Sequence, residues 1–207
     1  MASAVERRDV QAREARDRLA GVLDLHPKRL AGLDFELASL LAFRLEQAQE
    51  AAHLASRDEL TGLLTRTHGR DTIGREIDRA SRSHEKLSLL FIDFDGLKKV
   101  NDEHGHAIGD HLLARVGETL SDTLRVYDIA VRWGGDEFVV VLPDCDLQRA
   151  QRIAERIERE FANSTHHTIT WGAAELQPSE DFSGLIKRAD IAMYQVRRAR
   201  QAERESR

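Results

Sequence analysis

The stretch that decides the fold reads Ile129-Ala-Val-Arg-Trp-Gly-Gly-Asp-Glu-Phe-Val-Val-Val-Leu142. Apolar side chains alternate along its first arm, and an apolar second arm follows until Pro143. The pair Gly134-Gly135 lies between the arms, as in a two-residue turn. Alternating arms joined by such a pair predict a β-hairpin.

Other strands and helices are expected around this hairpin. The apolar run Leu87–Ile92 ends abruptly at Asp93, which is typical of a central strand buried on both faces. A further strand is predicted near residues 168–173, and the expected helices span residues 60–83, 109–124, 147–161 and 182–201. Strands interleaved with helices indicate an α/β fold, or an α+β sandwich in which helices cover the sheet.

Residues 1–56 carry helical patterns and no strand signal, so we expect an N-terminal helical stalk before a domain at 57–207. The helices are predicted at about 5–25 and 30–56, separated by His26-Pro27. The second contains a seam with spacings of three and four, which favours dimerisation through a coiled coil. A helix packed on its own domain is the alternative. The seam is Ala38, Leu41, Leu45, Ala48, Ala52 and Ala55.

Composition narrows the function classes. The 207 residues are 41% hydrophobic and 32% charged, as in a soluble globular protein, and the formal net charge of −5 argues against duplex nucleic acid as a partner. Cys145 is the only cysteine, so no internal disulfide is expected. No apolar run approaches the ~20 residues of a membrane span, and residues 1–10 are too charged for a signal peptide. We therefore expect a cytoplasmic protein with no membrane partner.

Carboxylates gather where the predicted strands end. Asp136 and Glu137 flank the glycine pair, while Asp93 and Asp95 follow the buried strand. If the two strands are neighbours, Asp93 and Asp136 converge at one edge of the sheet. Carboxylate oxygens suit Mg²⁺, which typically takes one or two of them together with phosphate oxygens. The alternative is that these acids only cap turns.

The motifs together resemble the GGDEF family of diguanylate cyclases. The resemblance covers about residues 57–200 and implies a nucleotidyl-cyclase-like, mostly antiparallel sheet covered by helices. It is carried by Arg132-Trp-Gly-Gly-Asp-Glu-Phe138, by Asp58-Glu-Leu-Thr-Gly-Leu63, by Asp93-Phe-Asp95 with Lys98, Asn101-Asp102, Gly105-His106 and Gly109-Asp110, and by Ala189-Asp190 through Met193-Tyr194.

The resemblance implies roles for individual residues. Asp93, Asp136 and the backbone carbonyl of Phe94 are expected to hold Mg²⁺, with Mn²⁺ as a possible substitute. Glu137 is expected beside the metal, where it helps to activate the attacking hydroxyl, so Asp136 and Glu137 are the catalytic candidates. The remaining substrate-binding candidates are Gly96, Leu97 and Lys98 for phosphate, Asn101 and Asp110 for the guanine edge, Gly134 and Gly135 for close backbone approach, and Arg197 for phosphate.

The expected reaction condenses two GTP molecules into cyclic di-GMP and two pyrophosphates. One domain that holds one GTP cannot do this alone, so the resemblance implies a homodimer, and pairing of the stalk would raise the effective concentration of the half-sites. Arg125-Val-Tyr-Asp128 resembles the family's inhibitory R-x-x-D site for the product, with Arg156 as a secondary contact. An exposed ion pair at a strand end is the alternative reading.

The C-terminal tract departs from the family pattern. Arg197 stands where a phosphate-binding lysine is usual, and Gln201 stands where an arginine is usual, so Arg200 or Arg204 is a candidate to compensate. Two other function classes stay open: a receptor for GTP or cyclic di-GMP without catalysis, which the intact carboxylates disfavour, and a cyclase that makes a mixed GMP–AMP product, which Asp110 disfavours. A purely structural dimerisation module is the least favoured reading, because it needs no carboxylate cluster.

Overall fold

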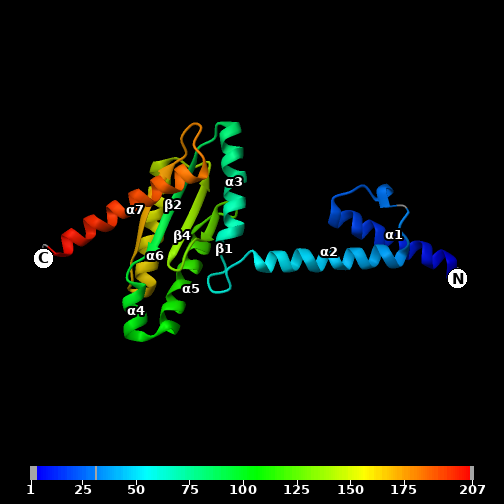
Figure 1. Ribbon diagram of the computed structural model, residues 1–207, viewed down its shortest axis with the longest axis horizontal. Coiled ribbons are helices and arrows are strands. Elements are labelled where there is room, and N and C mark those ends of the chain that lie inside the picture. The colour runs from blue at the N-terminus through cyan, green and yellow to red at the C-terminus, as the bar shows by residue number, and fades with distance from the viewer. Residues whose placement is uncertain (1–3, 31, 206–207) are drawn as a thin grey trace. The chain divides into compact units, whose positions relative to one another are not determined.

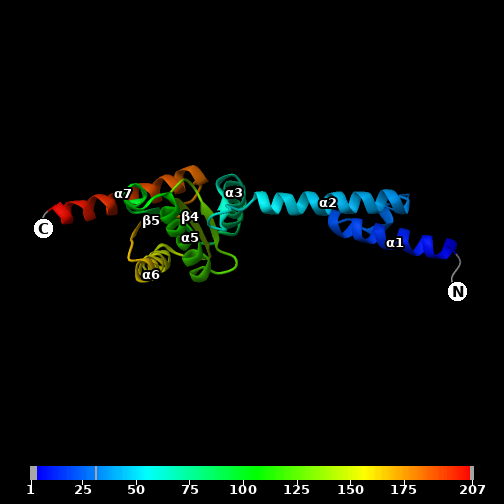
Figure 2. The ribbon, with the colours of Figure 1, turned by 90° about the horizontal axis from the view of Figure 1, so that it is seen from below.

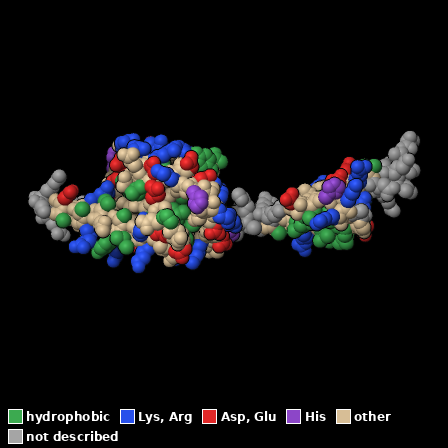
Figure 3. Space-filling view, turned by 90° about the horizontal axis from the view of Figure 1, so that it is seen from above, with side chains coloured by type: hydrophobic (Ala, Val, Ile, Leu, Met, Phe, Trp, Pro, Cys, Tyr) green, Lys and Arg blue, Asp and Glu red, His purple; other side chains and the backbone are tan. Residues whose placement is uncertain are grey.

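The computed structural model describes residues 4–30 and 32–205. The chain divides into two compact units, Met1–Ala55 and Ser56–Arg207. None of the helices in the described part is long and apolar enough to cross a membrane. On the face of the second unit seen in Figure 3, basic and acidic side chains are interspersed.

The first unit is a pair of helices joined by a short 3-10 turn. Helix α1 spans Ala4–Leu23, the turn η1 spans Pro27–Leu30 and helix α2 spans Phe35–Ala55. The second helix begins five residues later than predicted, because Asp34 Oδ1 accepts a hydrogen bond from the backbone N–H of Leu37 at 2.8 Å and so acts as its N-cap.

The two helices of this unit pack on each other through small side chains. Ala15, Leu19, Ala38 and Ala42 are all buried at 5% exposure or less. Ala38 is therefore covered within its own chain, whereas Leu41, the next residue of the predicted seam, remains 39% exposed. The side chains of Ala52 and Ala55 lie outside the described ones, so the stalk's pairing with a second copy stays a prediction.

The second unit is built on a five-stranded sheet with the order β1-β3-β4-β2-β5. The strands are β1 (Leu64–Thr65), β2 (Leu87–Phe94), β3 (Ile129–Arg132), β4 (Glu137–Pro143) and β5 (Ile169–Glu175). Only the short β1 runs parallel to its neighbour, and the other three pairings are antiparallel. Every residue of β2 is buried, so the predictions of a central strand and of a mostly antiparallel sheet are confirmed.

Helices cover both faces of this sheet (Figures 1 and 2). One face packs on α3 (Arg66–Ser83) and α7 (Phe182–Glu205), and the other packs on α5 (His106–Thr123) and α6 (Leu147–Thr165), with α4 (Leu97–His104) beside α5. Successive side chains along β2 and β4 point alternately into two hydrophobic cores, one on each face of the sheet. The first contains Leu90, Ile92, Phe94, Phe138 and Val140, and the second contains Leu89, Phe91, Val139 and Val141.

Two helices differ from the prediction. The helix expected from residue 60 begins at Arg66, because Asp58 Oδ1 accepts hydrogen bonds from the backbone N–H (3.0 Å) and the hydroxyl (2.8 Å) of Thr61 and closes a turn instead. Gly62, at φ +71°, continues that turn. The short helix α4 was missed, and it is separated from α5 by Gly105, at φ +83°.

The hairpin turn also differs from the prediction. Four residues rather than two lie between the end of β3 at Arg132 and the start of β4 at Glu137. The carbonyl of Glu137 accepts from the N–H groups of both Trp133 (2.8 Å) and Gly134 (3.2 Å), which closes this wider loop. Asp136 therefore lies in the loop, ahead of the strand.

Candidate active site

Asp93 and Asp136 lie at the same edge of the sheet. Strands β2 and β4 are direct neighbours, with Asp93 opposite Glu137, and the N–H of Phe94 donates to the carbonyl of Asp136 at 3.0 Å. Asp93, Phe94 and Asp136 line one cavity of about 430 Å³. The convergence expected for two neighbouring strands is therefore present. The rest of the lining is Asp95, Gly96, Leu97, Lys98, Thr170, Arg197, Arg200 and Gln201.

Asp93 is the most buried carboxylate of this cavity. It is 8% exposed, and burial raises its pKa to about 6, against the opposing effect of a hydrogen-bonded ion pair with Arg197. The nearby charges of Asp136 and Asp95 raise the pKa further. A carboxylate that is costly to ionise beside a second carboxylate is an environment that a bound cation would stabilise.

The donor set fits a hard divalent cation. Within residues 4–30 and 32–205, no group of three or more histidine, cysteine or acidic side chains is arranged to hold a metal. The proposed ligands Asp93, Phe94 and Asp136 all line the cavity, and two carboxylates and a backbone carbonyl are all oxygen donors. Mg²⁺ commonly takes one or two protein carboxylates and completes its shell with water and substrate phosphates. The residues present therefore fit this metal when it arrives with a phosphorylated ligand.

Asp95, two residues after Asp93, forms hydrogen bonds to residues at the start of β5. Its carboxylate accepts hydrogen bonds from the hydroxyls of Thr168 (2.8 Å) and Thr170 (2.6 Å), and its N–H donates to the carbonyl of Thr168 at 3.1 Å. These bonds tie the end of β2 to the start of β5. Asp95 thereby fixes the strand end that carries Asp93.

The phosphate candidates Gly96, Leu97 and Lys98 all line the cavity at the start of α4. Gly96 has φ +81°, a conformation that favours glycine and turns the chain sharply from β2 into the helix. Lys98 is exposed, so its ammonium group is free to reach a ligand. The structure thus brings together the predicted metal ligands and the predicted phosphate contacts.

The base-reading candidates lie outside this lining. Asn101 is on α4, and Asp110 is exposed on α5. Asn101 Oδ1 is buried and, among the described residues, has no hydrogen-bond partner. A buried acceptor without a donor costs free energy, about 1–3 kcal/mol, which a ligand N–H group would recover. A Cβ at Gly109 would lie 2.0 Å from this oxygen, so the glycine makes room for the amide.

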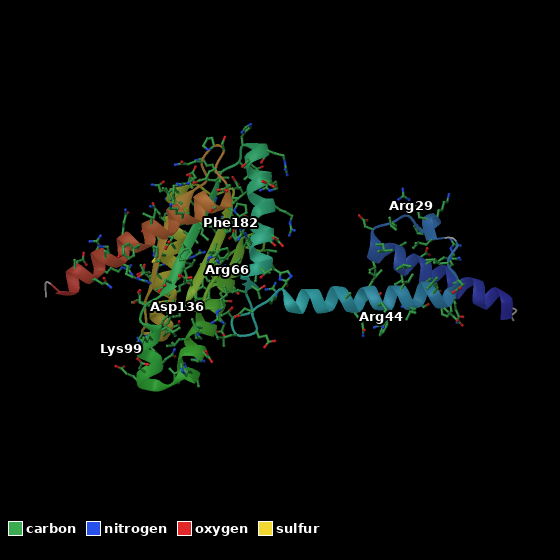
Figure 4. All side chains as sticks on the ribbon, in the orientation of Figure 1. Arg29, Arg44, Arg66, Lys99, Asp136 and Phe182 are labelled. Atoms are coloured by element: carbon green, nitrogen blue, oxygen red, sulfur yellow. The ribbon has the colours of Figure 1, made fainter. Side chains whose placement is uncertain are left out.

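Glu137 is not brought into the cavity that Asp136 lines. Its side chain lines a separate cavity of about 470 Å³ with Arg66, Trp133 and Phe182. Figure 4 labels Arg66 and Phe182, and both contact the Trp133 ring, with the guanidinium carbon of Arg66 4.7 Å from the ring centroid. Burial raises the pKa of Glu137, and the charge of Asp136 raises it further. A Cβ at Gly134 would lie 2.6 Å from Glu137 Oε2, whereas Gly135 has open space around it.

Arg132 was not singled out from the sequence, although it begins the hairpin motif. Its Nη1 donates to both oxygens of Asp58 at 3.0 and 3.1 Å, and its Nη2 donates to the carbonyl of Gly135 at 2.9 Å. The side chain is only 18% exposed. Arg132 therefore joins the segment that precedes α3 to the glycine turn.

The predicted inhibitory residues also come together. Arg125, Asp128 and Arg156 line a cavity of about 310 Å³, to which Arg149 and Arg152 contribute as well. Asp128 Oδ2 accepts from the N–H of Arg125 at 2.8 Å and closes a turn. Sequence reasoning missed Arg149 and Arg152, although their spacing of three and four residues along one helix was a visible signal. Four arginines around one acid suit a polyanion.

Comparison with known proteins assigns the family. The family model "Diguanylate cyclase, GGDEF domain" matches residues 55–203, so the chain belongs to the GGDEF diguanylate cyclase family. The response regulator PleD of Caulobacter vibrioides is 37% identical over 155 residues, and diguanylate cyclase DosC of Escherichia coli K12 is 36% identical over 155 residues. Each match covers 70% of this chain but only 34% of the relative, so the chain spans about a third of their length.

A solved structure of similar fold supports the family. The coiled coil and GGDEF domain of DgcB from Caulobacter crescentus, in complex with cyclic di-GMP, aligns with a TM-score of 0.74 at 27% identity. The alignment covers 83% of this chain and 94% of that one.

Proposed function

We propose that this protein is a Mg²⁺-dependent diguanylate cyclase that condenses two GTP molecules into cyclic di-GMP and two pyrophosphates. The observation that carries the proposal is the single cavity that joins Asp93 and Asp136 to Gly96, Lys98 and Arg197. Nucleotidyl transfer needs carboxylates that bind a cation and basic side chains that bind a polyphosphate. Asp93 and Asp136 provide the first at this edge of the sheet, and Lys98 and Arg197 provide the second.

The chemistry uses these residues in defined roles. The 3′-oxygen of one GTP forms a bond to the α-phosphorus of the other, the bond from that phosphorus to the bridging oxygen breaks, and pyrophosphate leaves with the electron pair. Asp93 and Asp136 would hold Mg²⁺, which would neutralise charge and lower the pKa of the hydroxyl. Glu137, whose pKa is raised, accepts the proton, provided that its side chain rotates from the neighbouring cavity.

Selectivity for guanine is assigned to Asn101 and Asp110. Guanine presents N–H donors at N1 and at the amino group, which match the unpartnered Oδ1 of Asn101 and the carboxylate of Asp110. Adenine lacks this donor pair, so ATP should compete weakly with GTP.

Ring closure requires two half-sites, so the active species is proposed to be a homodimer. The exposed apolar side chains Leu37, Leu40 and Leu41 of α2 support pairing through the first unit. A fragment that begins at Ser56 should then lose activity as it is diluted, whereas the whole chain should keep it.

The arginine-lined cavity is proposed as the inhibitory product site, because Arg125, Asp128 and Arg156 lie together with two further arginines. The same observation favours the second candidate function, a receptor that binds cyclic di-GMP there without making it. Arg197 on Asp93 fits this reading as well, because it occupies a proposed metal ligand.

Incubation with GTP and Mg²⁺, followed by chromatography for cyclic di-GMP, tests the proposal. We expect product from the wild type, none from Asp136→Ala, and relief of inhibition in Arg125→Ala. Binding of cyclic di-GMP by a wild type that makes no product would support the receptor instead.

A further inference from the structure

We propose that Arg200, held in place by Glu158, is the second α7 cation of the triphosphate site and supplies the charge that Gln201 cannot. This inference rests on the proposed GTP substrate. It names a phosphate-binding residue in this chain and a positioning residue behind it.

The helix geometry puts Arg200 at the cavity. Arg197 and Arg200 are three residues apart on α7 and so lie on the same face, and both line the cavity of Asp93 and Asp136. Gln201 also lines it, but its amide is neutral. Lys98 approaches from α4, so a polyphosphate in this cavity would lie between cations from two helices.

Arg197 already interacts with two carboxylates of the cavity. It pairs with Asp93 and approaches Asp95 to 3.8 Å. Arg200 is less involved with them, because its nearest approach to Asp95 is 4.0 Å. Arg200 is therefore the α7 cation of this cavity that is less engaged with Asp93 and Asp95.

The guanidinium of Arg200 is fixed from behind. Its Nη2 donates to Glu158 Oε1 at 2.6 Å, and its Nη1 donates to the carbonyl of Ile169 at 3.1 Å. The other oxygen of Glu158 accepts from Trp171 Nε1 at 2.8 Å, so Glu158 is itself immobilised on α6. A fixed guanidinium loses little freedom when a ligand binds, which favours affinity.

Arg200 keeps unused N–H donors and exposed surface with which to bind a ligand. A guanidinium has five N–H donors, and these two bonds use two of them. Its side chain is 34% exposed and lines the cavity. Arg198 provides a matched control, because it is an exposed arginine on the same helix that does not line the cavity.

Calorimetric titration with inorganic tripolyphosphate and with GMP in Mg²⁺ buffer tests the inference without turnover. Arg200→Ala should bind tripolyphosphate about tenfold or more weakly, as expected for a lost charged hydrogen bond, and should bind GMP nearly as the wild type does. Arg198→Ala should match the wild type. Arg200→Lys should recover part of the loss, which a merely structural role of Arg200 would not produce.

Glu158→Gln tests the positioning role, because it keeps the shape but removes the charge that holds the guanidinium. We expect weaker tripolyphosphate binding with unchanged GMP binding and, in a turnover assay, a raised KM for GTP with little change in kcat. The double variant Glu158→Gln, Arg200→Ala also removes the acid that Arg200→Ala leaves without its guanidinium partner, and so guards against misfolding of Arg200→Ala. It should bind tripolyphosphate as weakly as Arg200→Ala.

The two proposals fail separately. If Arg200→Ala binds tripolyphosphate as tightly as the wild type does, or if the wild type does not bind it, the role of Arg200 is overturned even if cyclic di-GMP is made. Arg200-dependent binding without any cyclic di-GMP upholds that role and overturns the cyclase.

Discussion

Gly172→Ala should force α7 away from the sheet and destabilise the second unit. Gly172 is on β5, opposite Phe91 on β2, and its missing side chain would point at α7. An ideal Cβ there would lie 2.1 Å from the backbone nitrogen of Met193 and 2.2 Å from the carbonyl oxygen of Ala189. Carbon contacts are normally about 3.5 Å or longer, so the helix must retreat by about 1.4 Å.

The loss of stability in Gly172→Ala depends on how easily the backbone of α7 can move away from the added Cβ. Overpacking a well-packed site costs about 1–3 kcal/mol, and backbone atoms cannot rotate aside as side chains do, so we expect about 3 kcal/mol. In a unit of this size each kcal/mol lowers Tm by about 2–4 °C, which gives a fall of about 6–12 °C. Differential scanning calorimetry of the whole chain measures this directly.

Gly74→Ala is the matched control. Gly74 is on α3 and nothing lies within 4 Å of an added Cβ, so the change should only improve helix propensity. That gain is about 0.8–1 kcal/mol, or a rise of roughly 2–4 °C in Tm. Equal Tm values for Gly172→Ala and the wild type would refute the close approach of α7 to β5.

Three further predictions address the site. Asp93→Asn should raise Tm at pH 8 but change it little near pH 4. The pKa of the Asp93 carboxyl is about 6 in the folded protein against 3.8 in the unfolded chain, so the wild type loses up to about 3 kcal/mol of stability as the pH rises through this window. An unchanged Tm difference from pH 4 to pH 8 would contradict it. Gly109→Ala should displace the Asn101 amide and raise KM for GTP about tenfold in steady-state assays, and an unaltered KM would count against guanine reading there. Arg156→Ala should weaken cyclic di-GMP binding about tenfold by calorimetry, whereas Arg159→Ala, outside the arginine cavity, should not; equal affinities would dismiss that site.

The parts of the fold that could be predicted are those with strong local patterns. The run Leu87–Ile92 is apolar except at Ser88, which is typical of a strand covered on both faces, and β2 is such a strand. The short helix α4 buries only Val100, so its sequence carries almost no apolar period to detect. The segment before α3 was misjudged because an aspartate that closes a turn looks like one that caps a helix.

The site was predictable to the extent that it depends on neighbouring strands. Asp93 and Asp136 meet because β2 and β4 pair, which the hairpin and the buried run together suggested. The contact of Arg197 with Asp93 joins residues 104 positions apart and depends on how α7 lies across the sheet. Glu137 was expected beside the metal, but the orientation of its side chain depends on the packing of Trp133 and Arg66, which no local pattern reports.

The bonds of Arg132 have a practical consequence for dividing the protein. By its helices and long strands alone, the second unit could be cut out at Arg66, the first residue of α3. Such a fragment would lack Asp58, and the guanidinium of Arg132, 18% exposed, would lose this carboxylate partner while still bonded to the carbonyl of Gly135. The smallest fragment that preserves the loop bearing Asp136 therefore includes residues that belong to no helix and to no long strand.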